Sequence, residues 1–256
     1  MSSNLHDLQQ VYDYASYLPE GYRDALENYF NNSMGTSAWK LQNFPKYVPR
    51  QSLTRFIVRY EIFKKILNIQ GSIIEIGVLD GASLMTWAQF SAIFEHLNYQ
   101  RKVIGFDVFG DFPVAGEKDK TGEALKMYED GKMSLDSYDD IKKAIEVFDQ
   151  NRFLSSIEKV ILVKGDVKET APSFIKQFPE TIVSLLYLDV NLYEPTKAAL
   201  DAFLPRMPKG SVIVFDELND RGLPGETIAL MDSIDIRKLR IERFSFDTKI
   251  SFAVIE

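Results

Sequence analysis

The sequence of 256 residues contains no cysteine and only two histidines. The absence of thiols excludes disulfide scaffolds, thiolate zinc sites and cysteine nucleophiles. No apolar run approaches the roughly 20 residues that cross a bilayer. Residues 1–20 have neither the basic nor the apolar segment of a signal peptide. These absences predict a soluble, cytoplasmic protein with no membrane partner, whose catalysis depends on carboxylates, Lys, Tyr, His or a hard metal ion.

The sequence also has fewer basic than acidic residues. It contains 30 Lys and Arg and 37 Asp and Glu, which gives a net charge of −7. Without a concentrated basic stripe, no nucleic-acid partner is expected, since phosphate neutralisation supplies most of that affinity. Hydrophobic residues make up 45% of the chain, which is enough for a sizeable core. The length favours one α/β domain with a short helical cap.

Residues 1–70 have the apolar spacing of helices. The spacing holds from Leu5 to Ala15 and from Tyr22 to Phe30. From Ser52 to Leu67 the apolar residues form a clear amphipathic face, with Ser52 as the expected N-cap. The stretch 33–50 between these helices is rich in turn formers and is predicted to be a loop.

From Gly71 onward, short apolar runs alternate with helical segments. The predicted strands are 72–78, 102–108, 159–165, 182–190 and 211–217, and the predicted helices are 83–96, 170–177, 195–204 and 224–234. Such alternation is typical of a parallel sheet covered on both faces. In the tail, alternating apolar residues over 239–246 and a turn at Asp247 and Thr248 predict a closing antiparallel hairpin.

The segment 110–156 is charged and helix-prone, and it is too long for an ordinary crossover. Ligands of parallel sheets bind at the carboxyl ends of the strands. We therefore expect this segment to be an insertion that lies over that edge.

The first predicted strand runs into a glycine loop, Glu75-Ile-Gly77-Val-Leu-Asp-Gly81, followed by Ser83 in the next helix. Glycines between a strand and a helix let the backbone and the helix N–H groups approach a ligand. The spacing G-x-x-x-G differs from the dinucleotide-binding pattern G-x-G-x-x-G. Preceded by Glu, it matches the first motif of class I S-adenosylmethionine methyltransferases. An ordinary tight turn between a strand and a helix is the alternative.

Two acids follow the next two strands. Asp107 ends the second strand, about 30 residues after the glycine loop, where a carboxylate can accept both hydroxyl groups of a ribose. Its alternative role is a helix N-cap. Asp166 ends the third strand, where it faces either an adenine amino group or the N-terminus of the helix from Thr170.

Three acids follow the fourth and fifth strands, namely Asp189, Asp216 and Glu217. Adjacent parallel strands bring their ends about 5 Å apart. Three carboxylates at that spacing repel one another unless a positive group lies between them. A hard divalent cation, Mg²⁺ or else Ca²⁺ or Mn²⁺, takes such oxygen ligands. A solvated acidic rim, or Glu217 as a cap, is the alternative.

The pairing of LDVNLYEPTKAAL (188–200) with KGSVIVFDELND (209–220), followed by LPGE (223–226), resembles the macrocin O-methyltransferase family. Within it, the sequence is most similar to the dTDP-6-deoxyhexose 3-O-methyltransferases of antibiotic pathways. The likeness extends from Val48 to Glu256. It implies a class I methyltransferase (Rossmann-like) fold, which is α/β with a seven-stranded, mostly parallel sheet. A C-terminal antiparallel hairpin, an N-terminal helical cap (1–70) and a lid (110–156) inserted in the methyltransferase domain (71–256) complete this expectation.

The resemblance also implies roles for the candidate residues. Those implied to bind S-adenosylmethionine are Glu75, Gly77, Gly81, Ser83, Asp107 and Asp166, and those implied to hold Mg²⁺ are Asp189, Asp216 and Glu217. The implied catalytic residues are Asp189, Asn191 and Glu217. Relatives commonly carry an Asp at the position of Asn191, and Asn cannot accept a proton at neutral pH. The base is therefore open among Glu217, Asp220, Glu226 and a metal-bound water.

The predicted function is S-adenosylmethionine- and Mg²⁺-dependent O-methylation of a deoxysugar, on a nucleotide carrier, by a homo-oligomer. Lys197, Arg221 and residues of the insertion 110–156 are candidates for binding the diphosphate of that carrier. A nicotinamide-dependent oxidoreductase is the first alternative, which the spacing of Gly77 and Gly81 disfavours. A non-catalytic relative that keeps the cofactor pocket is the second, because of Asn191.

Overall fold

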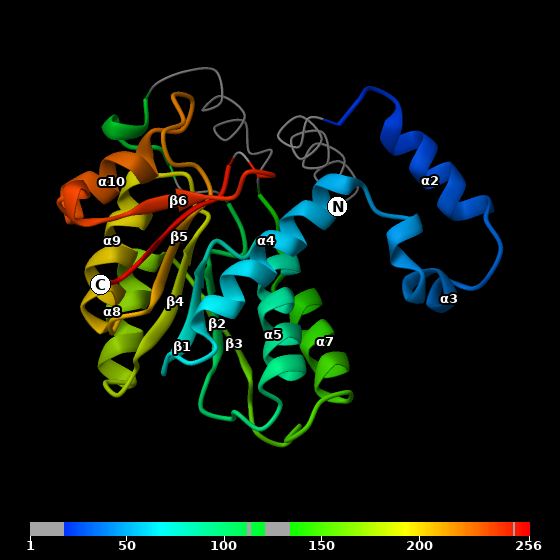
Figure 1. Ribbon diagram of the computed structural model, residues 1–256, viewed down its shortest axis with the longest axis horizontal. Coiled ribbons are helices and arrows are strands. Elements are labelled where there is room, and N and C mark those ends of the chain that lie inside the picture. The colour runs from blue at the N-terminus through cyan, green and yellow to red at the C-terminus, as the bar shows by residue number, and fades with distance from the viewer. Residues whose placement is uncertain (1–17, 112–113, 121–133, 248) are drawn as a thin grey trace.

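The computed structural model describes residues 18–111, 114–120, 134–247 and 249–256. A seven-stranded sheet in the order β3-β2-β1-β4-β5-β7-β6 forms the centre (Figure 1). Its strands are β1 (Ser72–Ile76), β2 (Val103–Asp107), β3 (Val160–Lys164), β4 (Val183–Leu188), β5 (Val212–Phe215), β6 (Ile241–Arg243) and β7 (Ser251–Val254). The first five are parallel. The α/β fold class predicted from the sequence is confirmed.

The C-terminal hairpin is confirmed as well, and its placement is informative. β7 pairs antiparallel with both β5 and β6, so the last strand lies between them. The apolar residues Phe252 and Ala253 explain this position, because β7 is covered on both faces while β6 at the edge is only half-buried.

Two layers of helices cover the sheet (Figure 1). On one face lie α4 (Arg50–Ile66), α5 (Ala82–Phe94) and α7 (Tyr138–Asp149). On the other face lie α8 (Val167–Gln177), α9 (Tyr193–Phe203) and α10 (Gly225–Ser233). Alternate strand residues serve the two layers, and so Ile73 packs toward α4 and α5 while Ile74 packs toward α8 and α9. Short 3₁₀ helices lie at Leu204–Arg206 and Ile236–Lys238.

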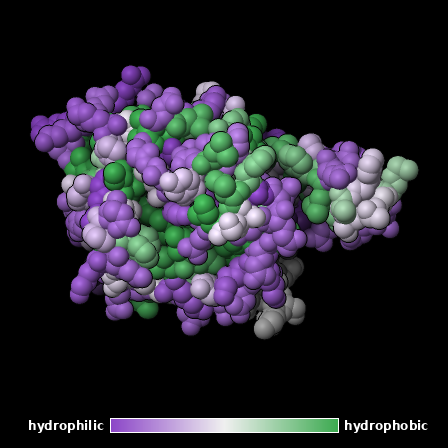
Figure 2. Space-filling view, turned by 90° about the horizontal axis from the view of Figure 1, so that it is seen from below, coloured by the Kyte–Doolittle hydropathy of each residue, from purple (hydrophilic) through white to green (hydrophobic). Residues whose placement is uncertain are grey.

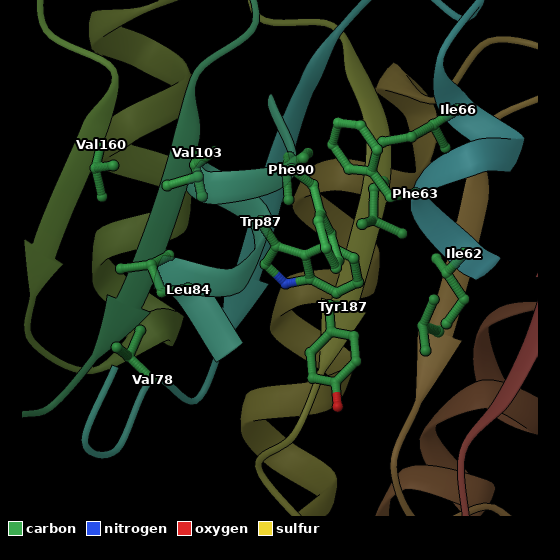
Figure 3. Close-up of a cluster of buried hydrophobic side chains, with 14 of the residues drawn as sticks. Ile62, Phe63, Ile66, Val78, Leu84, Trp87, Phe90, Val103, Val160 and Tyr187 are labelled. Atoms are coloured by element: carbon green, nitrogen blue, oxygen red, sulfur yellow. The ribbon is translucent and has the colours of Figure 1, made fainter. Parts of the chain in front are cut away.

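An aromatic cluster joins α4 and α5 to the sheet (Figure 3). Trp87 of α5 makes edge contacts with Phe90 and with Tyr187 of β4, at centroid distances of 6.5 and 5.7 Å. Phe63 of α4 lies 5.7 Å from Phe90. All four rings are buried. This cluster fixes α4 on the sheet, directly below the carboxyl ends of the strands.

The N-terminal helices differ in part from the prediction. α2 (Tyr22–Asn32) forms where helical spacing predicted it. The predicted loop 33–50 is wrong in part, because it contains α3 (Ser37–Gln42) and a 3₁₀ helix (Phe44–Lys46). The hydroxyl of Thr36 caps α3 by accepting the N–H of Trp39 at 3.3 Å. The predicted helix at residues 5–15 lies outside the described residues.

Ser52 as the N-cap of the long helix is also wrong. The N-cap lies three residues earlier, at Pro49, and α4 begins at Arg50. Pro49 has the extended conformation (φ −66°, ψ 151°) that a cap residue adopts, and the missing side-chain acceptor left no local signal for this start.

The segment 110–156 contains a 3₁₀ helix, Glu117–Asp119, and α7, which contributes buried Ile141 and Phe148 to the core. Asp119 is buried and accepts the N–H of Tyr193, at the start of α9, at 2.7 Å. Residues 112–113 and 121–133 of the predicted lid lie outside the described residues. No helix in the described part of the chain is long and apolar enough to cross a membrane.

Candidate active site

The loop between β1 and α5 contains two glycines in left-handed conformations, Gly77 with φ +89° and Gly81 with φ +85°. A methyl group on Gly77 would collide with the carbonyl oxygen of Asp189 after β4. A methyl group on Gly81 would lie 2.9 Å from the Ile141 side chain. Both glycines therefore allow close packing of the loop against other parts of the fold. Their contact with a cofactor remains a prediction.

A group of buried polar side chains lies beneath this loop. Glu75 is wholly buried, and neither of its carboxylate oxygens has a hydrogen-bond partner among the described residues. Arg59 Nε, Ser83 Oγ and Trp87 Nε1 also lack a partner at hydrogen-bond distance in the described chain, although the Ser83 and Trp87 donors lie near enough to Glu75 to lower its pKa. Burial raises the pKa of Glu75 to about 8, against the opposing charge of Arg59. Polar groups left incomplete at this depth cost free energy until a ligand completes them.

Asp107 connects the two loops on either side of it. Its Oδ2 accepts the N–H groups of Val78 and Leu79 at 2.7 and 3.0 Å, and its Oδ1 accepts that of Phe109 at 2.7 Å. Leu79 and Phe109 both have positive φ, which these hydrogen bonds help to maintain. The acid therefore orders the glycine loop, rather than capping a helix.

Asp166 is the N-cap of α8. Its Oδ1 accepts the N–H of Lys168 at 2.9 Å, and its other oxygen lies 3.2 Å from the Lys168 ammonium group. The helix begins at Val167, three residues before the predicted start at Thr170. The capping role that the sequence left open is thus present, while contact with an adenine remains a prediction.

The three acids after β4 and β5 converge as expected. Asp189, Asp216 and Glu217 each offer an oxygen, and the three oxygens lie within 4.8 Å of one another. Leu188 pairs with Phe215 in the parallel ladder, and so the residues that follow emerge side by side. Asp216 and Glu217 are only 3% and 7% exposed. We call these three residues the acid cluster.

The chain itself places cations beside the acid cluster. Arg55 of α4 donates from Nη1 to Asp216 Oδ1 at 2.5 Å and from Nη2 to Oδ2 at 3.1 Å. The Lys249 ammonium group lies 3.6 Å from Glu217 Oε1. The hydroxyl of Tyr187 points out of its hydrophobic cluster and lies 3.4 Å from Asp216 Oδ1 (Figure 3).

The charges in and around the cluster shift its pKa values in opposite directions. Burial raises the pKa of Asp189 to about 7, and the neighbouring Asp216 carboxylate adds to the rise. Burial and Asp216 also raise the pKa of Glu217 well above its ordinary value. Burial alone would raise the pKa of Asp216, but the charge of Arg55 outweighs it and holds that pKa low. Of the three acids, only Asp216 has enough positive charge beside it to outweigh the effect of burial on its pKa.

Glu226 at the start of α10 fastens the two acidic loops together. Its Oε1 accepts the N–H groups of Val190 and Asn191, and its Oε2 accepts that of Glu217, all at 3.2 Å. Glu226 is wholly buried, and Asn191 has a positive φ of 62°. The carboxylate thus sets the backbone positions from which Asn191 and Glu217 project.

Sequence reasoning missed Arg55, Arg59 and the fastening role of Glu226. The arginines are four residues apart on α4, so they share one side of the helix. That spacing was the available signal, but nothing local told which side faces the strand ends.

These features can be compared with known proteins. A model of the macrocin O-methyltransferase (TylF) family matches residues 58–233. The chain belongs to this family. It is an S-adenosylmethionine-dependent O-methyltransferase. Among curated proteins, no match is found.

Solved structures agree with this membership. The structure named CalS11, calicheamicin methyltransferase, is 28% identical, with 91% of this chain and 90% of that chain covered and a TM-score of 0.86. An apo structure of CalS11, named as a TDP-rhamnose 3'-O-methyltransferase, is 28% identical over 91% and 92%, with a TM-score of 0.78. The O-methyltransferase NovP, 18% identical over 79% of each chain with a TM-score of 0.63, shares the fold.

The described residues fit S-adenosylmethionine. Its amino-acid end carries both an ammonium and a carboxylate group. The polar group beneath the glycine loop offers the carboxyl group of Glu75 together with the polar side chains of Arg59, Ser83 and Trp87 around it. The macrocin O-methyltransferase fold thus presents, side by side, polar groups that suit the cofactor and a set of carboxylates.

Proposed function

We propose that the protein transfers the methyl group of S-adenosylmethionine to a hydroxyl group of a nucleotide-linked deoxysugar. In this proposal Mg²⁺, or another hard divalent cation, is held by Asp189, Asp216 and Glu217. The convergence of these carboxylates within 4.8 Å carries the proposal, since oxygen ligands are what such cations prefer. The name of CalS11, a TDP-rhamnose 3'-O-methyltransferase, supports the substrate class.

The cofactor residues follow from the same proposal. Glu75, Gly77, Gly81 and Ser83 would line the methionine and ribose parts. Asp107 would accept the ribose hydroxyl groups with the lone pairs that its three backbone hydrogen bonds leave over. Asp166 would face the adenine from the start of α8.

A cation bound at the acid cluster would acidify the sugar hydroxyl group that it ligates and hold it for in-line attack on the methyl carbon. Among the protein side chains, the base candidates can now be ranked. Asp220 is exposed and accepts the N–H of Gly222 at 2.7 Å. Glu226 is engaged by three N–H groups. We favour Glu217, because it belongs to the acid cluster and its Oε2 atom has no hydrogen-bond partner among the described residues.

The diphosphate candidates are less well placed. Lys197 is paired with Asp201 one helical turn away, at 2.5 Å, and Arg221 lies in a loop after the acid cluster. Arg55 and Arg59 of α4 lie closer to the acids, which favours the N-terminal helices as the source of the cation for an anionic substrate.

We also propose the predicted division into a cap, residues 1–70, and a methyltransferase domain, residues 71–256, with a lid in 110–156. α4 belongs to the cap in sequence but lends Arg55 to the acid cluster. A homo-oligomer is proposed on the basis of exposed apolar residues on α2 and α3.

Two substitutions test the function. Asp107→Ala removes the acceptor that orders the glycine loop, so we expect S-adenosylhomocysteine binding to be lost in calorimetry. Asp216→Ala leaves that loop intact, so it should retain S-adenosylhomocysteine binding and lose more than about a hundredfold in metal-dependent turnover, roughly the effect of losing one electrostatic catalytic contact. Turnover is measured on a panel of dTDP- and UDP-deoxysugars with Mg²⁺.

The matched control is Asp201→Ala, an exposed aspartate on α9, which should keep full turnover. Unchanged turnover after EDTA treatment would refute the metal role, and retention of cofactor affinity by Asp107→Ala would refute the assignment of the glycine loop.

A further inference from the structure

The acid cluster already has a cation of its own. The two Nη atoms of Arg55 donate to the two oxygens of Asp216, at 2.5 and 3.1 Å. Such a forked pairing is strong and directional. A divalent cation that uses Asp216 as a ligand must share this carboxylate with the guanidinium group or replace it.

The two partners of the pair differ in their surroundings. The Asp216 side chain is 5% exposed, whereas that of Arg55 is 28% exposed. Asp216 is held at the end of β5, while Arg55 reaches the cluster from the side of α4 on a long side chain. Arg55 can therefore move toward solvent with little rearrangement, and Asp216 cannot.

The acid cluster also has carboxylate oxygens that Arg55 does not contact. The Oε2 atom of Glu217 is buried and has no hydrogen-bond partner within the described ranges. The whole residue is only 7% exposed, so water has little access to this oxygen. Asp189 and Glu217 receive no direct hydrogen bond from Arg55, whose contacts with carboxylates in the described chain are with Asp216. An ion placed among all three acids would satisfy more of the cluster than Arg55 does.

We propose that Arg55 is the resident counter-ion of the acid cluster, and that a divalent cation binds there in competition with Arg55, displacing its guanidinium group from Asp216. The physical reason is repulsion, because a guanidinium group and a divalent cation on one carboxylate are like charges at close range. The inference rests on the proposed function, which makes the acid cluster the cation site.

The opposite role for Arg55 makes the opposite prediction. If Arg55 served to hold Asp216 in place for the cation, its removal would disorder a ligand and weaken binding. If Arg55 competes, its removal must strengthen binding. The sign of the change in cation affinity therefore decides between the two roles.

The experiment measures the dissociation constant of Mn²⁺ in the absence of cofactor and substrate, by electron paramagnetic resonance of the free ion, on the full chain. We expect Arg55→Met to bind Mn²⁺ about tenfold more tightly than the unaltered protein, a change equivalent to about 1.4 kcal/mol. Arg55→Lys, which keeps the charge but loses the fork, should fall between the two.

Two further variants serve as controls. Arg50→Met removes the same charge from an exposed position on the same helix, and it should leave the Mn²⁺ affinity unchanged. Asp216→Asn removes a ligand and should abolish binding at the cluster. Circular dichroism verifies that each variant is folded. If Arg55→Met does not fold, Arg55→Lys is compared with the unaltered protein instead.

Each outcome has one meaning. Suppose that the unaltered chain binds Mn²⁺ and that Asp216→Asn abolishes this binding. If folded Arg55→Met then binds Mn²⁺ equally well or more weakly than the unaltered chain, the competition is refuted and the metal site is retained. An equal gain in Arg50→Met would also overturn it, because a general charge effect would then explain the result. Absence of Mn²⁺ binding in every variant, or binding that Asp216→Asn does not affect, refutes the proposed metal site itself.

Discussion

At the scale of single residues, the acid cluster and its partner Arg55 come from distant parts of the chain. Asp189, Asp216 and Glu217 follow apolar runs that read as strands, and parallel strands place such residues at one edge. Arg55 is 161 positions from Asp216 in the chain, and only the packing of α4 on the sheet joins them. The expectation that something positive lies among the acids is met in part by Arg55, which no local pattern could place there, and the metal ion stays a prediction.

Glu226 illustrates a second limit at this scale. The sequence offered it as a base, because a carboxylate near an acidic cluster suggests proton transfer. In the fold it accepts three backbone N–H groups from two loops, a role that depends on chain geometry rather than on residue type.

A prediction at this scale concerns Glu75 and pH. Burial raises its pKa from 4.5 to about 8 in the folded protein, with Arg59 opposing the rise and Asp189 adding to it. Between these values the folded protein keeps a proton that the unfolded chain has lost, so stability falls as pH rises from about 4.5 to 8. We expect Glu75→Gln to remove a pH-dependent loss on the order of 5 kcal/mol over this range, measured by urea unfolding.

Glu146→Gln, on the exposed side of α7, is the control for this measurement and should leave the pH profile of the unaltered protein in place. The ionisable groups that face Glu75 are Arg59 from α4 and Asp189 from the loop after β4. A Glu75→Gln profile as steep as that of the unaltered protein would show that Glu75 is already ionised at neutral pH when folded.

At the scale of elements, strands and sheet-covering helices were predicted well because their signal is local. Solid apolar runs of five or six residues became β1 to β4 within one or two residues of the expected ends. The start of α4 and the whole of α3 were missed. Both depend on Pro49 and Thr36 in stretches rich in turn formers, where short helices and loops have the same composition.

The loop between β1 and α5 provides the second prediction. Gly77→Ala would force a methyl group against the Asp189 carbonyl oxygen at a positive φ, so we expect a loss of about 3 kcal/mol in the free energy of unfolding. Gly110→Ala is the matched control, because the nearest atom to its added methyl group is 3.8 Å away. Its loss should stay within about 0.5 kcal/mol.

Chemical denaturation measures both variants, and S-adenosylhomocysteine titration shows whether the loop still binds the cofactor. Equal stability of Gly77→Ala and Gly110→Ala would mean that the loop and the end of β4 separate freely, contrary to the close packing in the structure.

At the scale of the whole molecule, an N-terminal arm stands apart from the body. The arm comprises residues 18–47 with α2 and α3, and it lies away from the sheet in Figure 1 and forms a lobe at one end in Figure 2. α2 has no buried residue. Tyr47 packs within the arm against Tyr29 and Phe30, at ring distances of 5.5 and 5.2 Å. The exposed apolar side chains of the arm are Tyr22, Tyr29, Met34, Trp39, Leu41 and Phe44.

The arm leads to a prediction about assembly. A chain that begins at Val48 loses the arm and whatever precedes it, but keeps α4 and the core, so its free energy of unfolding per folded body should change by less than about 1 kcal/mol. We expect the full chain to be a homo-oligomer and the shortened chain a monomer, as measured by light scattering after size-exclusion chromatography, because apolar surface of this kind marks an interface.

Trp39→Glu within the full chain is a milder version of the same test, since it places a charge on the arm without removing it. A monomeric full chain, or a shortened chain that keeps the oligomeric state of the full one, would exclude the arm as the interface.

The contact between Gly77 and Asp189 has a consequence for the reaction itself. One loop belongs to the donor half of the proposed chemistry and the other to the acceptor half, and they touch main chain to main chain. Backbone atoms cannot change rotamer to absorb a shift, and packed interiors compress little. In the proposed reaction, this backbone contact thus fixes the distance between the methyl donor and the acceptor hydroxyl group. Adaptation to a larger or smaller sugar then has to come from the side chains around the contact.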